Sequence, residues 1–299
     1  MRNLLSKFTR AVGILKNQLF LLVFFNGFLL ALLVYFFTED NYESQIFKAL
    51  AQQVKQTTTS DNVDSIFKSS LNLTYNLEQY RLSVFGNKEI QSVKSDVIRP
   101  VTFDLMTGSG ACGSYSYVLS RLLNELGIET RFAQMKVGQN WGAHIIVEAK
   151  NGNKWVVLDP SYNLMFAKGS TGFASAKDLK ANWDLYKSQV PAEYDSRYQY
   201  EDVRYTNWDK YPVVLSFVKG AISLVKGKQA AEEFSMRNLV LKKFRFLFKV
   251  TLIIYIILSI YLLSTYLKRF KEVEEFRISL LFAKKAERKN VSAPATQLA

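Results

Sequence analysis

Residues 108–132 read GSGACGSYSYVLSRLLNELGIETRF, and they contain Cys112, the only cysteine of the chain. Downstream of Cys112, apolar side chains recur at the spacing that places them on one stripe of an α-helix. The members of this stripe are Tyr115, Val118, Leu119, Leu122, Leu123 and Leu126. Gly127 is a typical helix stop, and the Gly-Ser-Gly run at 108–110 interrupts regular structure upstream. The pattern predicts a helix that begins near Ala111 or Cys112.

A thiol at the start of a helix has a distinctive environment. The first turn has unpaired N–H groups and a partial positive charge, which lower the pKa of a thiol placed there. The small neighbours Gly110, Ala111 and Gly113 leave room for a substrate to approach the sulfur, and the same N–H groups can stabilise an oxyanion. A single cysteine is more often a small apolar core residue. The position of Cys112 at the glycine-flanked edge of the stripe weakens that interpretation.

A β-hairpin is predicted over residues 141–162, WGAHIIVEAKNGNKWVVLDPSY. Two runs rich in β-branched and aromatic residues, HIIVEA and KWVVLD, flank the dipeptide Asn151-Gly152, which is the strongest short-range hairpin signal. With these two residues as the loop, the only histidine, His144, lies directly opposite Asp159. Side chains that are opposed in this way share a face of the sheet, with Cβ atoms about 4.5–5.5 Å apart.

An imidazole and a carboxylate at that separation can form a hydrogen bond. The carboxylate would hold the tautomer of His144 and stabilise its charged form. Pro160 cannot donate a ladder hydrogen bond, so we expect the second strand to end after Asp159. Taken singly, His144 is also explained as a satisfied strand histidine, and Asp159 as an aspartate that starts a turn before proline. If the fold brings Cys112 to this pair, the three residues form a cysteine triad.

Two apolar runs are long enough to span a membrane. Residues 19–37, LFLLVFFNGFLLALLVYFF, carry no charge, and residues 250–267, VTLIIYIILSIYLLSTYL, carry none either. About 20 apolar residues cross the hydrocarbon core of a bilayer. A cleaved signal peptide has a shorter apolar core and a small-residue cleavage site. We therefore predict two transmembrane helices, at 19–37 and at 246–267.

The distribution of charge predicts how these helices are oriented. Four cations and no acidic residue precede the first run, and Glu39, Asp40 and Glu43 follow it. The positive-inside rule then places both termini in the cytoplasm and the middle of the chain in the periplasm or outside the cell. We expect the protein to lie in the cell (inner) membrane. One feature opposes this orientation. The cations Lys242, Lys243, Arg245 and Lys249 precede the second run and would lie on the outer side.

The two runs also divide the chain. The predicted segments are a basic cytoplasmic segment at 1–18, a folded domain at 41–210, an amphipathic or linker helix at 211–245 and a basic cytoplasmic tail at 268–299. Residues 213–225, VVLSFVKGAISLV, fit either an amphipathic helix on the membrane surface or a helix packed on the domain.

The composition excludes several classes of function. The net charge is +13, but no basic stripe is evident in the middle of the chain, so we expect no nucleic-acid partner. One cysteine rules out an internal disulfide, and there is no Cys/His cluster that would bind zinc. We expect no metal and no cofactor.

In their order and spacing, these motifs resemble the transglutaminase-like superfamily of the papain-type cysteine-protease fold. The resemblance covers about residues 105–163. Its motifs are Gly110-Ala-Cys112, Leu126-Gly-Ile-Glu-Thr-Arg131, His144 and Trp155-Val-Val-Leu-Asp159-Pro160. It implies an α+β fold with a papain/transglutaminase-like core, in which the helix that bears the cysteine packs on an antiparallel sheet. In this chain the core would be flanked by the two transmembrane helices.

The resemblance also implies a chemistry. Cys112 would be the nucleophile, His144 the base and Asp159 the residue that orients the base. Attack on a peptide amide would give a thioester, and the acyl group would pass to water or to an amine. The predicted protein is thus a membrane-anchored cysteine hydrolase or acyltransferase. Its partners would be membrane lipid, a peptide or protein amide substrate and, through the spans, a membrane protein. The alternative is a non-catalytic binding or scaffolding module of a membrane or envelope-assembly complex.

Overall fold

A computed structural model describes residues 2–58, 60, 62–86, 92–106, 111–169 and 172–291, with the side chains of those between 18 and 279. The predicted break at 108–110, including Gly110, lies outside the described residues. Two units make up the chain. One is Phe37–Phe246; the other holds the N-terminal part of the first long helix and most of the last.

The centre of the Phe37–Phe246 unit is a five-stranded antiparallel sheet. Its strands, in spatial order, are β4 (Leu164–Met165), β3 (Lys154–Asp159), β2 (Asn140–Asn151), β1 (Thr130–Val137) and β5 (Val203–Arg204). Side chains alternate between the two faces, so Ile145 and Val147 of β2 pack on one face, in two clusters, while Ile146 packs on the other. Both faces are covered, and the sheet is the middle layer of the unit.

One face of the sheet is covered by helices from the first half of the chain. These are α5 (Cys112–Glu125), α2 (Val63–Phe85), α4 (Val101–Met106) and the last turns of α1 (Arg2–Thr57). Helix α5 begins at Cys112, and Gly127 follows it with a φ of +81°. The helix predicted from the apolar stripe is therefore confirmed, and so is the α+β fold class.

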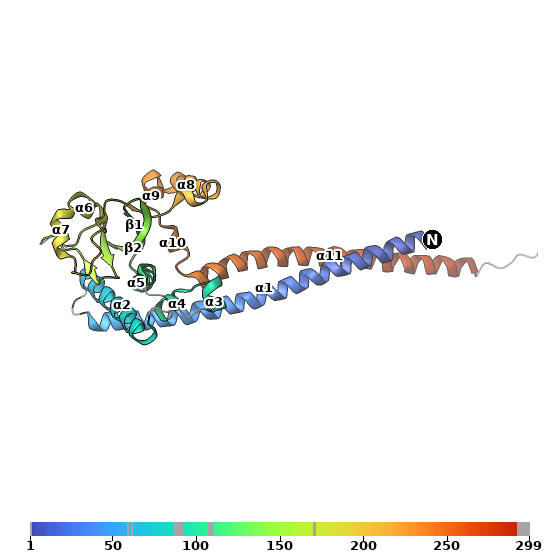
Figure 1. The fold of residues 1–299 in the computed structure, drawn as a ribbon. Helices are drawn as coiled ribbons and strands as arrows, with labels where there is room; N and C mark the ends of the chain where they lie inside the picture. The colour runs from blue at the N-terminus through green and yellow to red at the C-terminus, as the bar shows by residue number, and fades with distance from the viewer. Residues whose placement is uncertain are drawn as a thin grey trace, which may run out of the picture. The chain divides into compact units, whose positions relative to one another are not determined.

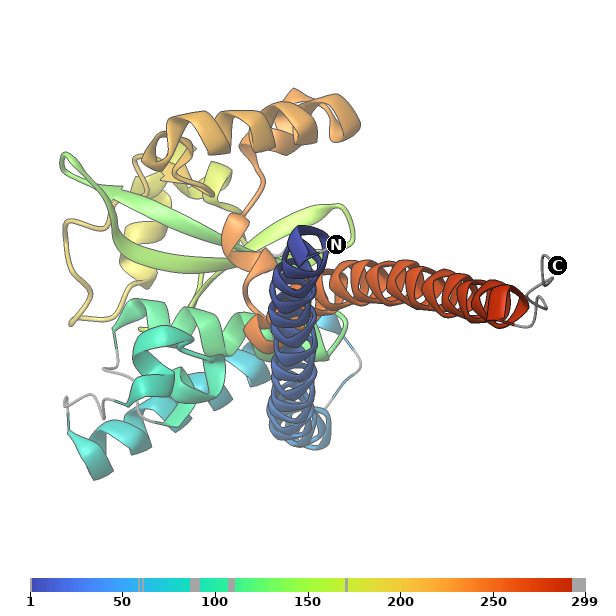
Figure 2. The same ribbon diagram turned by 90° about the vertical axis from the view of Figure 1, so that its right-hand side faces the viewer.

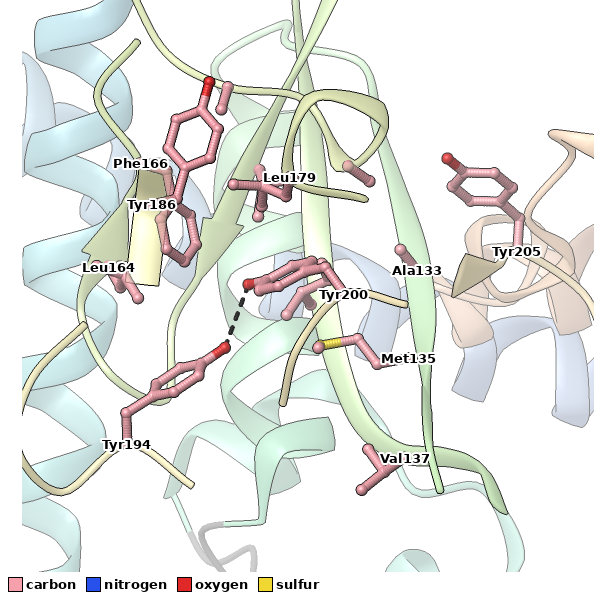
Figure 3. Packing of buried hydrophobic residues seen from close by; sticks show 14 residues of the cluster. Ala133, Met135, Val137, Leu164, Phe166, Leu179, Tyr186, Tyr194, Tyr200 and Tyr205 are labelled. Atoms are coloured by element: carbon pink, nitrogen blue, oxygen red, sulfur yellow. Dashed lines mark hydrogen bonds between the residues drawn. The ribbon is translucent and has the colours of Figure 1, made fainter. Parts of the chain in front are cut away.

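The other face is covered by α6 (Ala176–Ala181), α7 (Trp183–Tyr186) and the chain that leads to β5. Phe166 is fully buried in this core, with the rings of Tyr186 and Tyr200 edge-on to it (Figure 3). The Tyr194 hydroxyl donates to the Tyr200 hydroxyl at 3.4 Å. Each fully buried aromatic ring of this kind contributes about 1.5–3 kcal/mol of hydrophobic stabilisation. The core thus fixes the aromatic segment 190–202 onto the sheet.

The register of the β2–β3 hairpin differs from the predicted one. Asn151 pairs with Lys154, so the two-residue loop is Gly152-Asn153 rather than Asn151-Gly152. Gly152 has a φ of +60°, whereas Asn153 has no positive φ. This pattern, with glycine at the first loop position, is that of a type II′ turn.

The prediction that His144 lies directly opposite Asp159 is therefore wrong. The ladder pairs Val147 with Leu158, which shifts the partner of every β2 residue by two positions along β3. Side chains alternate with a period of two, so a shift of two positions keeps each one on its predicted face. His144 and Asp159 consequently remain on the same face as diagonal neighbours. Strand β3 does end at Asp159, immediately before Pro160.

After β5 the chain forms several short elements. The pattern suggested one helix over 211–245, and the structure has α8 (Pro212–Lys226), α9 (Lys228–Glu232) and α10 (Met236–Leu239). Gly227, with a φ of +90°, separates the first two. None of the residues of α8 is buried. The other short elements are α3 (Val93–Val97) and the 3-10 turns η1 (Lys187–Gln189) and η2 (Trp208–Lys210).

Helices α1 and α11 (Lys243–Val291) are the longest of the described chain (Figures 1 and 2). Both are long and apolar enough to cross a membrane, over Gln18–Thr57 and Lys243–Ser279. Each continues beyond its apolar run without a break, so α1 reaches into the folded unit as one helix. Within the apolar segments, the Ser259 hydroxyl donates to Asn26 Oδ1 at 2.7 Å. This bond provides a partner for a polar group in an otherwise apolar helix.

Candidate active site

Cys112 is the first residue of α5, and two contacts fix it against β2. The Ser116 hydroxyl donates to the Ile145 carbonyl at 2.8 Å, and the Ile145 backbone N–H donates to the Cys112 sulfur. The residue before the helix, Ala111, supplies no side-chain cap, and its carbonyl accepts the Ser114 N–H at 2.8 Å. The start of the helix is therefore held beside the residue next to His144.

His144 follows an irregularity in β2. His144 pairs with Met135 of β1, but the next pair is Trp141 with Lys136, which leaves two residues of β2 without an opposite partner. One of them is Gly142, with a φ of +79°. Bulges of this kind are common beside active sites, where they redirect a side chain. The bulge sets the direction of the strand at His144.

His144 and Asp159 form a buried pair. The His144 Nε2 and Asp159 Oδ2 atoms lie 2.7 Å apart, and the side chains are only 2% and 0% exposed. The other carboxylate oxygen, Oδ1, accepts the backbone N–H of Ser161 at 3.2 Å. Asp159 therefore starts the turn after β3 and also holds the imidazole. Asp159 thus fits both interpretations of the sequence, as an aspartate that starts a turn before proline and as the partner of His144.

The imidazole also reaches the thiol. Burial alone would raise the pKa of Cys112, but the hydrogen bond and the positive charge of His144 lower it below its ordinary value. Burial alone would lower the pKa of His144, but the Asp159 carboxylate and the Cys112 sulfur raise it to about 10. Both shifts favour the pair of thiolate and imidazolium over the pair of neutral groups. Because Nε2 is bonded to Asp159, Nδ1 is the nitrogen that remains to face the sulfur.

Two tyrosine rings cover the imidazole. The Tyr198 ring stacks on His144 with its centroid 4.4 Å away and its plane 10° from parallel, and Tyr162 approaches edge-on at 6.0 Å. Tyr194 packs against both tyrosines. The sequence analysis did not identify these residues. The one available signal was the density of tyrosines between residues 194 and 205, a segment with no helical or strand periodicity.

The structure describes part of the space around the sulfur. A Cβ at Gly113 would lie 4.0 Å from Ile145 Cδ1, so this glycine faces the sheet. Gly110, predicted to leave room for a substrate, lies outside the described residues. The backbone N–H of Cys112 is at the helix start, where it could donate a hydrogen bond to an oxyanion. Within the described ranges, no three His, Cys, Asp or Glu side chains gather as a metal site would require.

Comparison with protein families gives a match to part of the chain. Residues 48–160 match the model of the transglutaminase-like superfamily, over less than half of the chain. No curated protein matches the chain. The matched segment runs from the last turns of α1 to the residue after β3, and it includes Cys112, His144 and Asp159. The resemblance seen in the sequence motifs is confirmed over this segment.

Proposed function

We propose that the transglutaminase-like superfamily domain at residues 48–160 works as a cysteine hydrolase or acyltransferase on peptide amides. One observation carries the proposal. The buried His144 bonds to the Asp159 carboxylate at 2.7 Å on one side and to the Cys112 thiol on the other. Nucleophile, base and orienting group in this order are the requirement of cysteine acyl transfer.

Each residue then has a defined role. The Cys112 thiolate attacks the amide carbonyl carbon, and the N–H groups of the first turn of α5 stabilise the oxyanion. The His144 imidazolium gives its proton to the leaving amine, which departs as the thioester forms. In the second half, His144 takes a proton from water or from an incoming amine, and the acceptor displaces the sulfur. Asp159 keeps the ring in place and stabilises its charged form throughout.

We further infer that α1 and α11 anchor this domain in the cell membrane, with both termini cytoplasmic and the domain on the outer side. Two of the four cations that oppose this orientation have structural partners inside the domain. Arg245 Nε bonds to Asp40 Oδ2 at 3.0 Å, and the Lys243 ammonium donates to the Arg99 carbonyl. The positive-inside rule depends on free positive charge near a span. Cations that are paired within the folded domain are therefore weaker evidence against the proposed orientation.

An acyl-enzyme trap tests the proposed chemistry. The full-length protein in detergent is incubated with a pool of synthetic peptides that carry glutamine side chains and internal amides. It is then quenched in acid and analysed by intact-protein mass spectrometry. We expect an adduct on the wild type that hydroxylamine removes, and no adduct on Cys112→Ala or His144→Ala. A wild-type thiol that is highly reactive toward alkylation but forms no adduct favours the binding-module alternative.

A further inference from the structure

Helix α8 has an outward face that is entirely apolar. Val213 is 85% exposed, Phe217 80% and Leu224 90%, and their spacing of four and seven residues places them on one stripe. Val214 and Val225 flank this stripe and are also exposed. Single exposed apolar residues are normal, but a continuous apolar face marks a contact with a partner or a membrane.

The opposite face of α8 attaches the helix to its own domain. Leu215 and Ile222 are half-buried there. Lys219 bonds to Glu232 at 2.6 Å and lies over the Trp208 ring at 5.8 Å. The orientation of the helix is therefore set by the domain itself, and the apolar face is presented outward by the fold.

The charges along α8 favour an anionic partner, although Asp209 precedes this segment and Glu232 and Glu233 follow it. Residues 210–231 contain four lysines and no acidic residue. Three of the lysines, Lys210, Lys226 and Lys228, are exposed and lie at the two ends of the helix. Tyr211, 60% exposed, stands at the first turn. Apolar side chains along one face, cations beside them and an aromatic ring at the end describe a helix that lies in the surface of an anionic bilayer.

A second short helix, α3, also exposes apolar side chains and contacts α1 close in sequence to its apolar run. Lys94 of α3 bonds to Glu39 at 2.5 Å, and Glu39 is only two residues beyond the apolar run that ends at Phe37. Val93 and Val97 of α3 are 81% and 77% exposed. In Figure 1, α3 and α8 both lie on the right-hand side of the Phe37–Phe246 unit, α8 at its top and α3 at its bottom.

We propose that α8 lies in the surface of the membrane that α1 and α11 span, with Val213, Phe217 and Leu224 among the acyl chains and its lysines at anionic headgroups. This inference rests on the membrane anchoring of the proposed function and is independent of its chemistry. The helix is thereby a third membrane contact, which restrains how the domain can tilt relative to the bilayer.

The test uses full-length protein in which Cys112→Ser removes the only native thiol. A single cysteine is introduced by Phe217→Cys and labelled with the environment-sensitive dye NBD. The protein is reconstituted into vesicles of phosphatidylcholine alone or of equimolar phosphatidylcholine and phosphatidylglycerol, with or without doxyl-labelled lipid as quencher. We expect a blue-shifted NBD emission that doxyl lipid quenches, more strongly in the anionic vesicles.

Two control positions make the result decisive. Leu185→Cys on α7 is a matched apolar position, 72% exposed, and we expect no quenching there. Phe28→Cys, within the first apolar run, reports whether the anchoring itself holds. Quenching at 28 but not at 217 overturns the α8 proposal alone, whereas no quenching at 28 removes the anchoring on which it rests. A blue shift at 217 that doxyl lipid does not quench means that a protein covers the face, and also overturns it.

Discussion

At the scale of single residues, the site depends on one imidazole between two partners. His144 is buried against Asp159 at 2.7 Å and against the Cys112 thiol, so its charged form is favoured by two negative groups. The sequence analysis proposed all three residues as candidates, because each stands in a local motif. It did not predict the ring that covers them, because Tyr198 comes from a segment without periodicity and reaches His144 only through the tertiary fold.

Tyr198 is expected to act as a positioning residue for His144. Its stacked ring excludes water from one face of the imidazole, and this exclusion strengthens the attraction of Asp159 and Cys112. We expect Tyr198→Leu to move the pH profile of Cys112 alkylation by iodoacetamide to higher pH. Tyr198→Phe keeps the ring and should keep the wild-type profile. If Tyr198→Leu and Tyr198→Phe had the same pH profile of Cys112 alkylation, the ring would have only a structural role.

The charge of His144 also contributes to stability in a defined pH range. Its pKa is raised in the folded protein, so this contribution is complete below the unfolded pKa of about 6.5 and is lost as the pH rises toward about 10. In a Cys112→Ser background, Asp159 still raises the pKa of His144. We expect the thermal midpoint of this variant to exceed that of Cys112→Ser with His144→Gln, by a margin that shrinks as pH rises. A margin that grows with pH would contradict the assignment.

At the scale of elements, the helix and the strands were predictable but their exact pairing was not. The apolar stripe of α5 repeats over four turns and leaves little freedom, so its start at Cys112 follows from sequence. The run Asn151-Gly152-Asn153 offers two loops of two residues each, and the sequence does not choose between them. The error of two positions left His144 and Asp159 on one face, so the two side chains still meet despite the wrong register.

The bulge in β2 was not predicted, and its function can be tested by a pair of glycine substitutions. Gly142→Ala puts a side chain at a φ of +79°, 3.4 Å from Gln134 Oε1, and Gly152→Ala puts one at +60° with nothing within 4 Å. We expect both to destabilise the protein by about 1–3 kcal/mol through backbone strain. Only Gly142→Ala should also slow Cys112 alkylation at neutral pH. Equal rates for both variants would show that the bulge does not position His144.

At the scale of the whole molecule, the two apolar helices predict that the transglutaminase-like domain is held at a membrane. The sequence identified both apolar runs, but not that α1 continues unbroken to Thr57. Helical continuation past the run depends on packing within the domain, where Phe47 and Val54 are fully buried. The search of a sequence for apolar segments cannot reveal such packing.

The single cysteine also reports topology. We expect a membrane-impermeant maleimide to label Cys112 in sealed vesicles whose outer surface corresponds to the outside of the cell. In a Cys112→Ser background, Ser279→Cys, on the far side of the second apolar run, should react only after the vesicles are permeabilised. The reverse pattern would place the domain in the cytoplasm.

The most direct test of the account is the pH dependence of Cys112 alkylation in the wild type and in His144→Ala. An ordinary thiol becomes reactive as the pH approaches its pKa of about 8.5. The account predicts that the wild-type thiol reacts with iodoacetamide well below that pH, and that His144→Ala returns the profile to the ordinary range. Wild-type and His144→Ala profiles that coincide near pH 8.5, or a thiol that reacts only after unfolding, would contradict it.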